Sequence, residues 1–225
     1  GGKPETYHEK KARVLKQRLL RGGLREHVQA TNEKLFTATP QVLAARDAVP
    51  FPPLECEPLV PLPQATGAGG ALSLADTWGG HVTLLTLSFR AAGHKHLAPY
   101  HEAYHDLRVR LGADGDAASL DALQLWDVHY YEGVTYRLLK PLLRRGLRNV
   151  TSSEAVPSTL SHFANYSEIF CDDAGVHNRV IGFVYLIDGN GLIRWRAHNA
   201  AAPGEPEAMR EALGTLLEEA AAWAQ

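Results

Sequence analysis

Cysteine is scarce in this sequence, and its scarcity excludes two classes of protein. Only Cys56 and Cys171 occur among the 225 residues, far apart and without a C-x-x-C spacing. A disulfide framework or a thiolate zinc site needs more cysteines, or cysteines placed closer together. We therefore expect two free thiols, in keeping with a reducing compartment.

Long apolar runs are also missing. A membrane-spanning helix needs roughly 20 apolar residues, whereas the longest run here, residues 82–87, has the length of a strand. The sequence therefore predicts a soluble or peripheral protein. Because the chain opens at Gly1 rather than at a methionine, and its first segment contains glutamates, we expect a mature chain whose targeting peptide has been removed.

Charge is present but unevenly distributed. Residues 1–48 hold ten Lys/Arg against five Asp/Glu, and the remainder holds thirteen against twenty, so a +5 front precedes a −7 body in a chain of net charge −2. A basic front suits docking on an acidic protein, RNA or anionic lipid, while a solvated helix face explains it equally well. The candidate partner-binding cations in this segment are Arg13, Lys16, Arg21 and Arg25.

The chain divides into three parts on composition. Residues 1–49 form a basic, helix-permissive extension, which Gly22 and Gly23 should break in two. Residues 50–73 are rich in proline and glycine, and we interpret them as an extended linker. Residues 74–225 should form one folded domain, because a chain of this length supports a single core of ordinary size.

Periodicity within residues 74–225 predicts strands alternating with helices. Strands are expected at 82–89, 123–131, 182–188 and 192–197, the last two joined by a Gly-Asn-Gly turn at which Asp188 caps local backbone. Helices are expected near 97–111, 134–145, 158–171 and 205–223. The first helix has Pro99 in its opening turn and a buried stripe of Leu97, Tyr100, Tyr104, Leu107 and Leu111.

This order of elements predicts the fold class. A right-handed crossover would make the first two strands parallel, whereas the late hairpin must be antiparallel. The result is an α/β fold, a thioredoxin-like mixed sheet flanked by helices, with a helical basic N-terminal extension.

The late hairpin also carries a resemblance. Gly182-Phe183-Val184-Tyr185-Leu186-Ile187-Asp188 and Gly191-Leu192-Ile193-Arg194-Trp195, with the helix from Glu205, resemble the mitochondrial assembly factors of thioredoxin-like fold that help to build the membrane sector of ATP synthase. The segments at Ser88-Phe89-Arg90 and Tyr136–Lys140 are similar too, so the resemblance covers about 74–221. It implies a chaperone-like protein of the mitochondrial matrix, peripheral to the inner membrane, and it supplies no catalytic residues.

Thiol chemistry is not expected here. Redox enzymes of this fold place two cysteines after the first central strand, where a helix N-terminus lowers the thiol pKa. This chain has Arg90-Ala91-Ala92-Gly93 at that place. It also has Ile181-Gly182-Phe183 where such enzymes carry a cis-proline.

A second motif, His101-Glu102-Ala103-Tyr104-His105, matches the H-E-x-x-H signature of zinc proteases. His94 and His96 lie just upstream, and Asp121 or Glu132 offers a third kind of ligand. If the apolar stripe faces the core, however, Glu102 points to solvent, where it is misplaced as a base. We therefore expect surface histidines and no metal, cofactor or catalytic residue, with a zinc hydrolase using His101, Glu102 and His105 as the weakest alternative.

The body of the chain holds further cations. Arg137, Lys140, Arg144 and Arg148 recur along one helical face, which is either solvated or available to an acidic partner or a lipid headgroup. Arg194 and Arg196 flank Trp195 and should share the opposite face of their strand. We assign these six residues, with the four N-terminal cations, to partner binding.

These features favour a non-catalytic protein that binds subunits of a mitochondrial inner-membrane or other large complex. An assembly factor that binds transiently is the first hypothesis. A permanent structural subunit of a ribosome, ATP synthase or respiratory assembly is the alternative. Contact with the membrane surface, or with RNA through the basic extension, stays open.

Overall fold

The computed structural model describes residues 34–165 and 167–223. The chain divides into two compact units, 1–36 and 37–225, and the second contains the elements described below. Its short 3-10 helices are η1 (Ala45–Asp47), η2 (Leu74–Thr77) and η3 (Val156–Ser158). Its α-helices are α3 (Ala91–Lys95), α4 (Ala98–Ala113), α5 (Ala117–Ala122), α6 (Val134–Leu138), α7 (Lys140–Val150), α8 (Glu168–Ala174) and α9 (Glu205–Trp223).

The strands form one mixed sheet, which has eight members within the described residues. They are β1 (Val49–Pro50), β2 (Glu55–Pro58), β3 (Leu72–Ser73), β4 (Val82–Ser88), β5 (Leu123–Glu132), β6 (Thr159–Ala164), β7 (Gly182–Ile187) and β8 (Leu192–His198). The spatial order is β1-β8-β7-β4-β5-β6-β2-β3. Strands β4, β5 and β6 run parallel, and β7 pairs antiparallel with both β4 and β8, which confirms the predicted mixed sheet.

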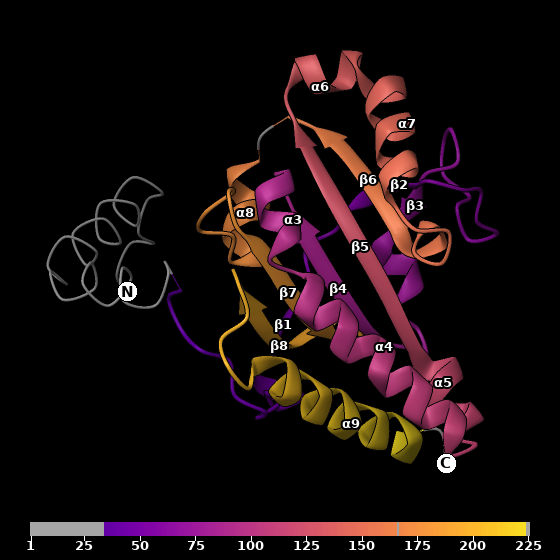
Figure 1. Cartoon of the computed structure of the whole chain (residues 1–225), viewed down its shortest axis with the longest axis vertical. Helices are drawn as coiled ribbons and strands as arrows, with labels where there is room; N and C mark the ends of the chain where they lie inside the picture. The colour runs from indigo at the N-terminus through magenta and orange to yellow at the C-terminus, as the bar shows by residue number, and fades with distance from the viewer. Residues whose placement is uncertain (1–33, 166, 224–225) are drawn as a thin grey trace, which may run out of the picture. The chain divides into compact units, whose positions relative to one another are not determined.

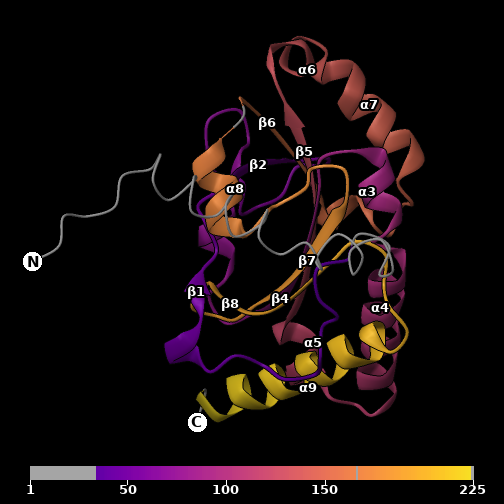
Figure 2. The same ribbon diagram turned by 90° about the vertical axis from the view of Figure 1, so that its left-hand side faces the viewer.

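Helices cover both faces of this sheet, as Figures 1 and 2 show. On one face, α4 and α9 bury Leu97, Tyr100 and Met209 against β4, β7 and β8. On the other, α8 and the loops that follow β1 and β2 bury aromatic residues, including Phe51, against the sheet. The fold class is therefore the α/β, thioredoxin-like arrangement that the sequence predicts. Among the described residues, no helix is both long and apolar enough to cross a membrane.

The expected helix stripe on α4 is confirmed. Leu97, Tyr100 and Tyr104 are buried, while Leu107 and Leu111 pack at the edge of the same cluster. Pro99 lies in the first turn, where its missing N–H leaves no helical bond unmade. The Tyr100 hydroxyl donates to Glu205 of α9 at 2.8 Å, which joins the two helices beneath the sheet.

The Pro/Gly-rich segment 50–73 is not a free connection, and here the linker interpretation is wrong. It contains β2, β3 and the second residue of β1, and it buries Phe51, Leu54 and Cys56 in the core. Prolines are tolerated because β1 and β2 are only two and four residues long and lie toward the edge of the sheet, where a missing N–H removes few ladder bonds. The boundaries 1–49, 50–73 and 74–225 stay predictions, and residues 1–33 of the basic extension lie outside the described residues.

Two predicted helices differ from the structure. The segment 158–171 contains strand β6, which joins the parallel sheet beside β5, and only α8 follows as helix. The segment 134–145 contains two helices, because α6 ends before Leu139 and Pro141 lies in the first turn of α7. By contrast, the Gly-Asn-Gly turn is as expected: Asp188 accepts hydrogen bonds from the backbone N–H of Asn190 and Leu192, both at 3.0 Å.

Candidate functional site

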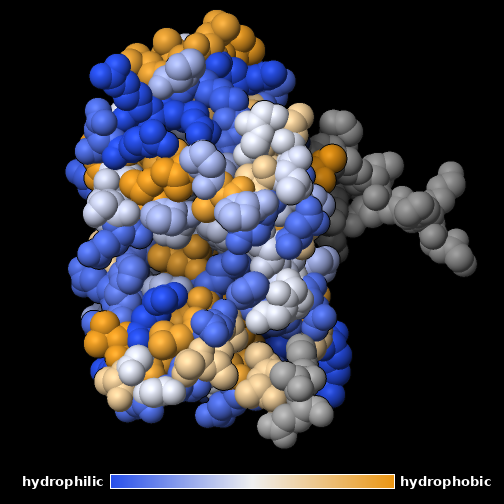
Figure 3. Space-filling view, turned by 90° about the vertical axis from the view of Figure 1, so that its right-hand side faces the viewer, coloured by the Kyte–Doolittle hydropathy of each residue, from blue (hydrophilic) through white to orange (hydrophobic). Residues whose placement is uncertain are grey.

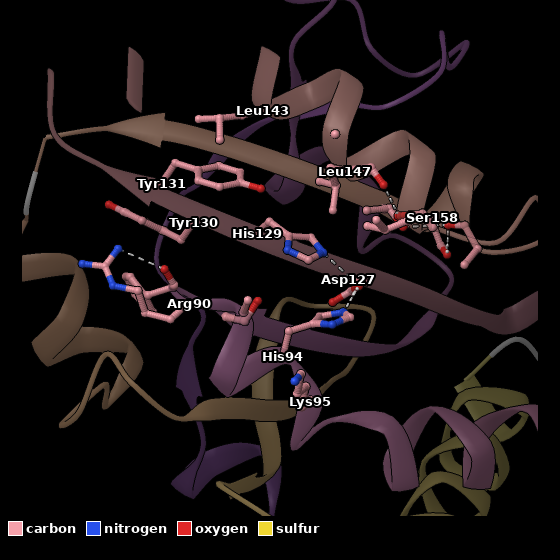
Figure 4. Close-up of a pocket in the computed structure, with 18 of the residues that line it drawn as sticks. Arg90, His94, Lys95, Asp127, His129, Tyr130, Tyr131, Leu143, Leu147 and Ser158 are labelled. Atoms are coloured by element: carbon pink, nitrogen blue, oxygen red, sulfur yellow. Dashed lines mark hydrogen bonds and ion pairs between the residues drawn. The ribbon is translucent and has the colours of Figure 1, made fainter. Parts of the chain in front are cut away.

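A cavity of about 800 Å³ lies between α3, β5 and α7. Figure 4 shows its polar floor, where β5 and α3 bring Asp127, His129 and His94 together, with Leu143 and Leu147 of α7 on the opposite side. Asp127 and His129 are two residues apart on strand β5, so their side chains point to the same face of the sheet. The parallel pairing with β4 places Thr86 beside Asp127 and Ser88 beside His129.

The carboxylate of Asp127 is the centre of this floor. Its Oδ2 atom lies 2.9 Å from His94 Nε2 and 3.3 Å from His129 Nε2. Its Oδ1 atom accepts a hydrogen bond of 2.8 Å from the hydroxyl of Thr86. Thr86 Oγ1 in turn lies 3.0 Å from His101 Nε2, so the imidazole must donate to a hydroxyl whose proton is already given to Asp127. We call these five residues the Asp127 cluster.

The electrostatics of the cluster follow from burial and from these contacts. Burial by itself would raise the pKa of the Asp127 carboxyl, but the hydrogen bond and charge of His129 and the hydrogen bond of His94 hold that pKa well below its usual value. The hydrogen bond to Asp127 raises the pKa of His94. Burial lowers the pKa of His101, which favours the neutral imidazole that the hydrogen bond to Thr86 requires.

Helix α3 is held against the sheet by a contact between two glycines. A Cβ atom built on Gly93 would lie 2.7 Å from the carbonyl carbon of Ile181, and one on Gly182 would lie 2.5 Å from the carbonyl oxygen of Gly93. Real Cβ atoms do not approach so closely, so both positions need glycine. This close approach fixes His94, one residue after Gly93, over Asp127.

The wall of the cavity is the amphipathic helix α7, whose apolar side lines the cavity and continues outward into solvent at Leu142 and Val150. Figure 3 shows apolar side chains gathered at the top of this face, over α6, and again below it. Of the side chains of α6 and α7, Leu138 is 78% exposed and Leu142 is 66% exposed. The α6–α7 apolar surface consists of Val134, Leu138, Leu139, Leu142 and Val150.

Three cations of α7 contact the protein instead, while Arg145 is exposed. The ammonium of Lys140 contacts the carboxylate of Glu57, and Arg144 binds the same carboxylate at 2.9 Å and the backbone carbonyl of Pro58 at 2.6 Å. Arg148 donates to the carbonyl of Leu59. These three cations therefore tie α7 to β2, while Arg137 is exposed. Their assignment to partner binding stays a prediction.

The pair on β8 is arranged differently from the expectation. A register shift at Leu186 and Ile187 breaks the alternation, so Arg194 and Arg196 do not share a face. Arg194 is buried and pairs with Asp188 at 3.0 Å and with Glu219 of α9 at 2.8 Å. Arg196 is exposed and lies near Gly175, at the end of α8. The four N-terminal cations, Arg13, Lys16, Arg21 and Arg25, lie outside the described residues.

The H-E-x-x-H segment does not assemble a protease-like centre. His101 points to Thr86, whereas Glu102 and His105 are exposed on α4. His94 and His101 do lie close together, with their ring centroids 6.2 Å apart. Neither Asp121 nor Glu132 supplies the acidic group near these histidines; Asp127 does.

A family comparison identifies the group of proteins to which the sequence is related. The model described as "ATP10 protein" matches residues 4–216, which is most of the chain. The chain belongs to the ATP10 protein family. This family acts in ATP synthase assembly and is associated with the mitochondrial inner membrane. The resemblance noted in the sequence is thereby confirmed, and the match begins 70 residues earlier than the expected start at 74, so it includes the basic extension and the segment 50–73.

Several solved structures are similar to this ATP10 family member, and the first of those below shows its fold. A secreted thiol-disulfide isomerase from Corynebacterium glutamicum has a TM-score of 0.50 at 12% identity, over 79% of this chain and 90% of its own. A thiol:disulfide interchange protein DsbE from Chlorobium tepidum has a TM-score of 0.43 at 17% identity, over 76% and 96%. BsSco, of the Sco family of cytochrome c oxidase assembly proteins, has a TM-score of 0.44 at 14% identity, over 78% and 99%. No curated protein matched significantly.

The two thiols of this family member are placed away from the cavity. Cys56 lies on β2 and Cys171 on α8, both buried and free. Burial raises the pKa of both thiols, that of Cys171 to about 11, so both stay protonated near neutral pH. The first helical turn after β4 contains Ala91 and His94 and no cysteine, as the sequence predicts.

Sequence reasoning missed Asp127 and His129. The search for ligands concentrated on the histidines of α4, and residues 123–131 were interpreted only as a strand. A signal was present: an Asp-x-His pair two residues apart on a strand parallel to β4, with His94 just beyond the end of β4. Parallel strands present side chains in register on one face, so this pattern could have placed the three together.

Proposed function

We propose that this ATP10 family member is a non-catalytic assembly factor that binds an apolar segment of an ATP synthase membrane-sector subunit through its α6–α7 apolar surface. The observation that carries the proposal is the exposure of apolar side chains along α6 and α7. Lys140, Arg144 and Arg148 contact Glu57 and backbone carbonyls, whereas Leu138 and Leu142 are more than half exposed. An exposed apolar surface of this kind marks an interaction site.

The partner's chemistry follows from the family and from this surface. Subunits of a membrane sector expose apolar helices until they are assembled, and such a helix matches a surface of Val134, Leu138, Leu139, Leu142 and Val150. Leu142 and Val150 also line the cavity, so its apolar part continues the surface inward. The exposed Arg137 at the same end could contact an acidic partner group.

The proposal includes a location on the matrix side of the inner membrane, where a soluble domain would meet newly made membrane subunits. Support comes from the family's association with this membrane. The family match gives no support to binding of RNA or of the membrane surface, and these are not part of the proposal.

The experiment replaces the endogenous protein with the double variant Leu138→Glu/Leu142→Glu in mitochondria and measures assembled ATP synthase on native gels. We expect a drop of about tenfold or more in assembled membrane sector, because two charged groups would be buried at the contact. The matched control is Val109→Glu, an equally exposed apolar position on α4, which should assemble normally.

Crosslinking then identifies the partner directly. Wild-type protein should crosslink to a newly synthesised membrane-sector subunit, and the double variant should not, although both retain the same thermal stability. Normal assembly with the double variant would contradict the proposed role of the α6–α7 apolar surface. Stoichiometric presence of the chain in the mature complex would instead favour a permanent subunit.

A further inference from the structure

The Asp127 cluster has the composition and spacing of a metal site. One donor atom from each of His94, Asp127 and His129 lies within 4.8 Å of the other two. Two such distances are known: Asp127 Oδ2 is 2.9 Å from His94 Nε2 and 3.3 Å from His129 Nε2. Ligands at 2.0–2.1 Å around a tetrahedral zinc ion are about 3.3–3.4 Å apart, so these donors need little movement to share one ion.

We propose that His94, Asp127 and His129 bind one divalent transition-metal ion of the zinc class. Two imidazoles and one carboxylate make the kind of three-ligand set that holds zinc with a coordination position left open. Each imidazole would present the lone pair of Nε2 to the ion and carry its proton on Nδ1. The proposal replaces the expectation from sequence that the chain binds no metal, and it uses a different donor set from the H-E-x-x-H motif.

The surroundings of these ligands are organised as in a metal site. Thr86 donates to Asp127 Oδ1, which leaves Oδ2 for an ion, and His101 in turn supports Thr86. Outer hydrogen bonds of this kind orient the ligands of a metal. His101 is therefore a positioning residue rather than a ligand.

A second observation points to an absent ligand. The hydroxyl of Ser88 is buried, lines the same cavity, and has no hydrogen-bond partner among the described residues. Buried polar groups are nearly always satisfied, so an orphan beside His129 calls for an explanation. A water or other ligand on the open position of the ion, inside the cavity, would supply its partner.

The site would have a structural consequence. His94 is on α3 and the other two ligands are on β5, so an ion would link this short helix to the sheet. His94 Nε2, at 2.9 Å from Asp127 Oδ2, is closer than ligands of one ion would be, so the imidazole of His94 has to move. The side chain of His94 is 38% exposed, against 13% for His129, so His94 also has room to move.

The test uses the full chain without an affinity tag, freed of metal with a chelator and titrated with Co²⁺. Visible absorption reports both the number of ions and their coordination, and Zn²⁺ is then used to displace Co²⁺. We expect one Co²⁺ per chain with a tetrahedral spectrum. His94→Ala and His129→Ala should each weaken binding by about 100-fold or more, and Thr86→Val by about 10- to 100-fold, the range for outer-layer partners.

His105→Ala is the matched control, since this exposed histidine of α4 lines the same cavity but lies outside the donor set. It should bind Co²⁺ like the wild type. Because His94 is partly exposed, His94→Ala should fold normally, which circular dichroism can establish. Absence of a Co²⁺ spectrum at one equivalent, retained binding in both ligand variants, or loss of binding in His105→Ala would each overturn the proposal.

Discussion

On the floor of the cavity, each member of the Asp127 cluster contacts another member, whereas on its wall the apolar side chains of α6–α7 extend into solvent. Thr86, His94 and His129 are held by a single carboxylate at 2.8–3.3 Å. Leu138 and Leu142 are instead more than half exposed. Fixed polar geometry suits a small ligand with strict bond lengths, and an exposed apolar surface suits a partner that is recognised by area and shape.

The difference also shows how α7 is held. A typical surface helix turns its apolar side to the core and its charges to solvent. In α7 the cations reach Glu57 and the carbonyls of Pro58 and Leu59, so polar contacts do the anchoring and Leu147 is the one fully buried apolar residue of this helix. The apolar face is thereby left for another molecule.

Removing the carboxylate of Asp127 should give the largest loss of stability. In Asp127→Ala, Thr86 and two imidazoles lose a buried charged partner, and we expect a loss of about 3–5 kcal/mol in the free energy of unfolding. Urea denaturation measures this change. Asp121→Asn, an exposed carboxylate on α5, is the control and should stay within about 0.5 kcal/mol of the wild type. A small loss in Asp127→Ala would show that the floor is not rigidly built.

A glycine-to-alanine substitution should lower the stability of the fold on one side of the cavity and raise it on the other. Gly93→Ala places a Cβ against the backbone of Ile181 and should cost about 1–3 kcal/mol. Gly146→Ala lies inside α7, where an added Cβ meets nothing, and should stabilise by about 0.5–1 kcal/mol through helix propensity. Thermal melts of both variants measure the pair, and equal effects would contradict this picture.

Weakening the anchoring of α7 should give the smallest loss of stability. Glu57→Gln keeps the size of the side chain but removes the charge that binds Lys140 and Arg144, and we expect a loss of about 1–2 kcal/mol. Hydrogen exchange should show faster opening of α7 than of α4. If α7 stayed as protected as in the wild type, its apolar surface rather than Glu57 would be holding it.

Local pattern was enough for the elements whose stabilisation is local. The apolar run of β4, the stripe of α4, the hairpin of β7 and β8, and helix α9 could all be predicted, because side-chain periodicity and turn residues act within a few positions. The absence of cysteines after β4 could likewise be read directly from the sequence, and it predicts no thiol chemistry at that place.

Local pattern failed where a short segment depends on a distant neighbour. Prolines in 50–73 predicted a linker, yet Glu57 pairs with β6 and Lys140, and Phe51 joins the core. The local pattern predicts helix over 158–171, whereas the six residues of β6 acquire their extended form by pairing with β5. The register shift on β8 reversed the predicted relation between Arg194 and Arg196.

The sequence by itself determined strand β4, helix α4, the β7–β8 hairpin and helix α9, the missing thiols and the kinship with the ATP10 family. Only the tertiary structure decided which side of α7 faces outward and which side chains meet Asp127. The physical reason is distance along the chain: His94 lies 33 positions from Asp127, and Lys140 lies 83 positions from Glu57. Such contacts exist only after the sheet has brought their segments together, because neither partner has a local pattern that specifies the other.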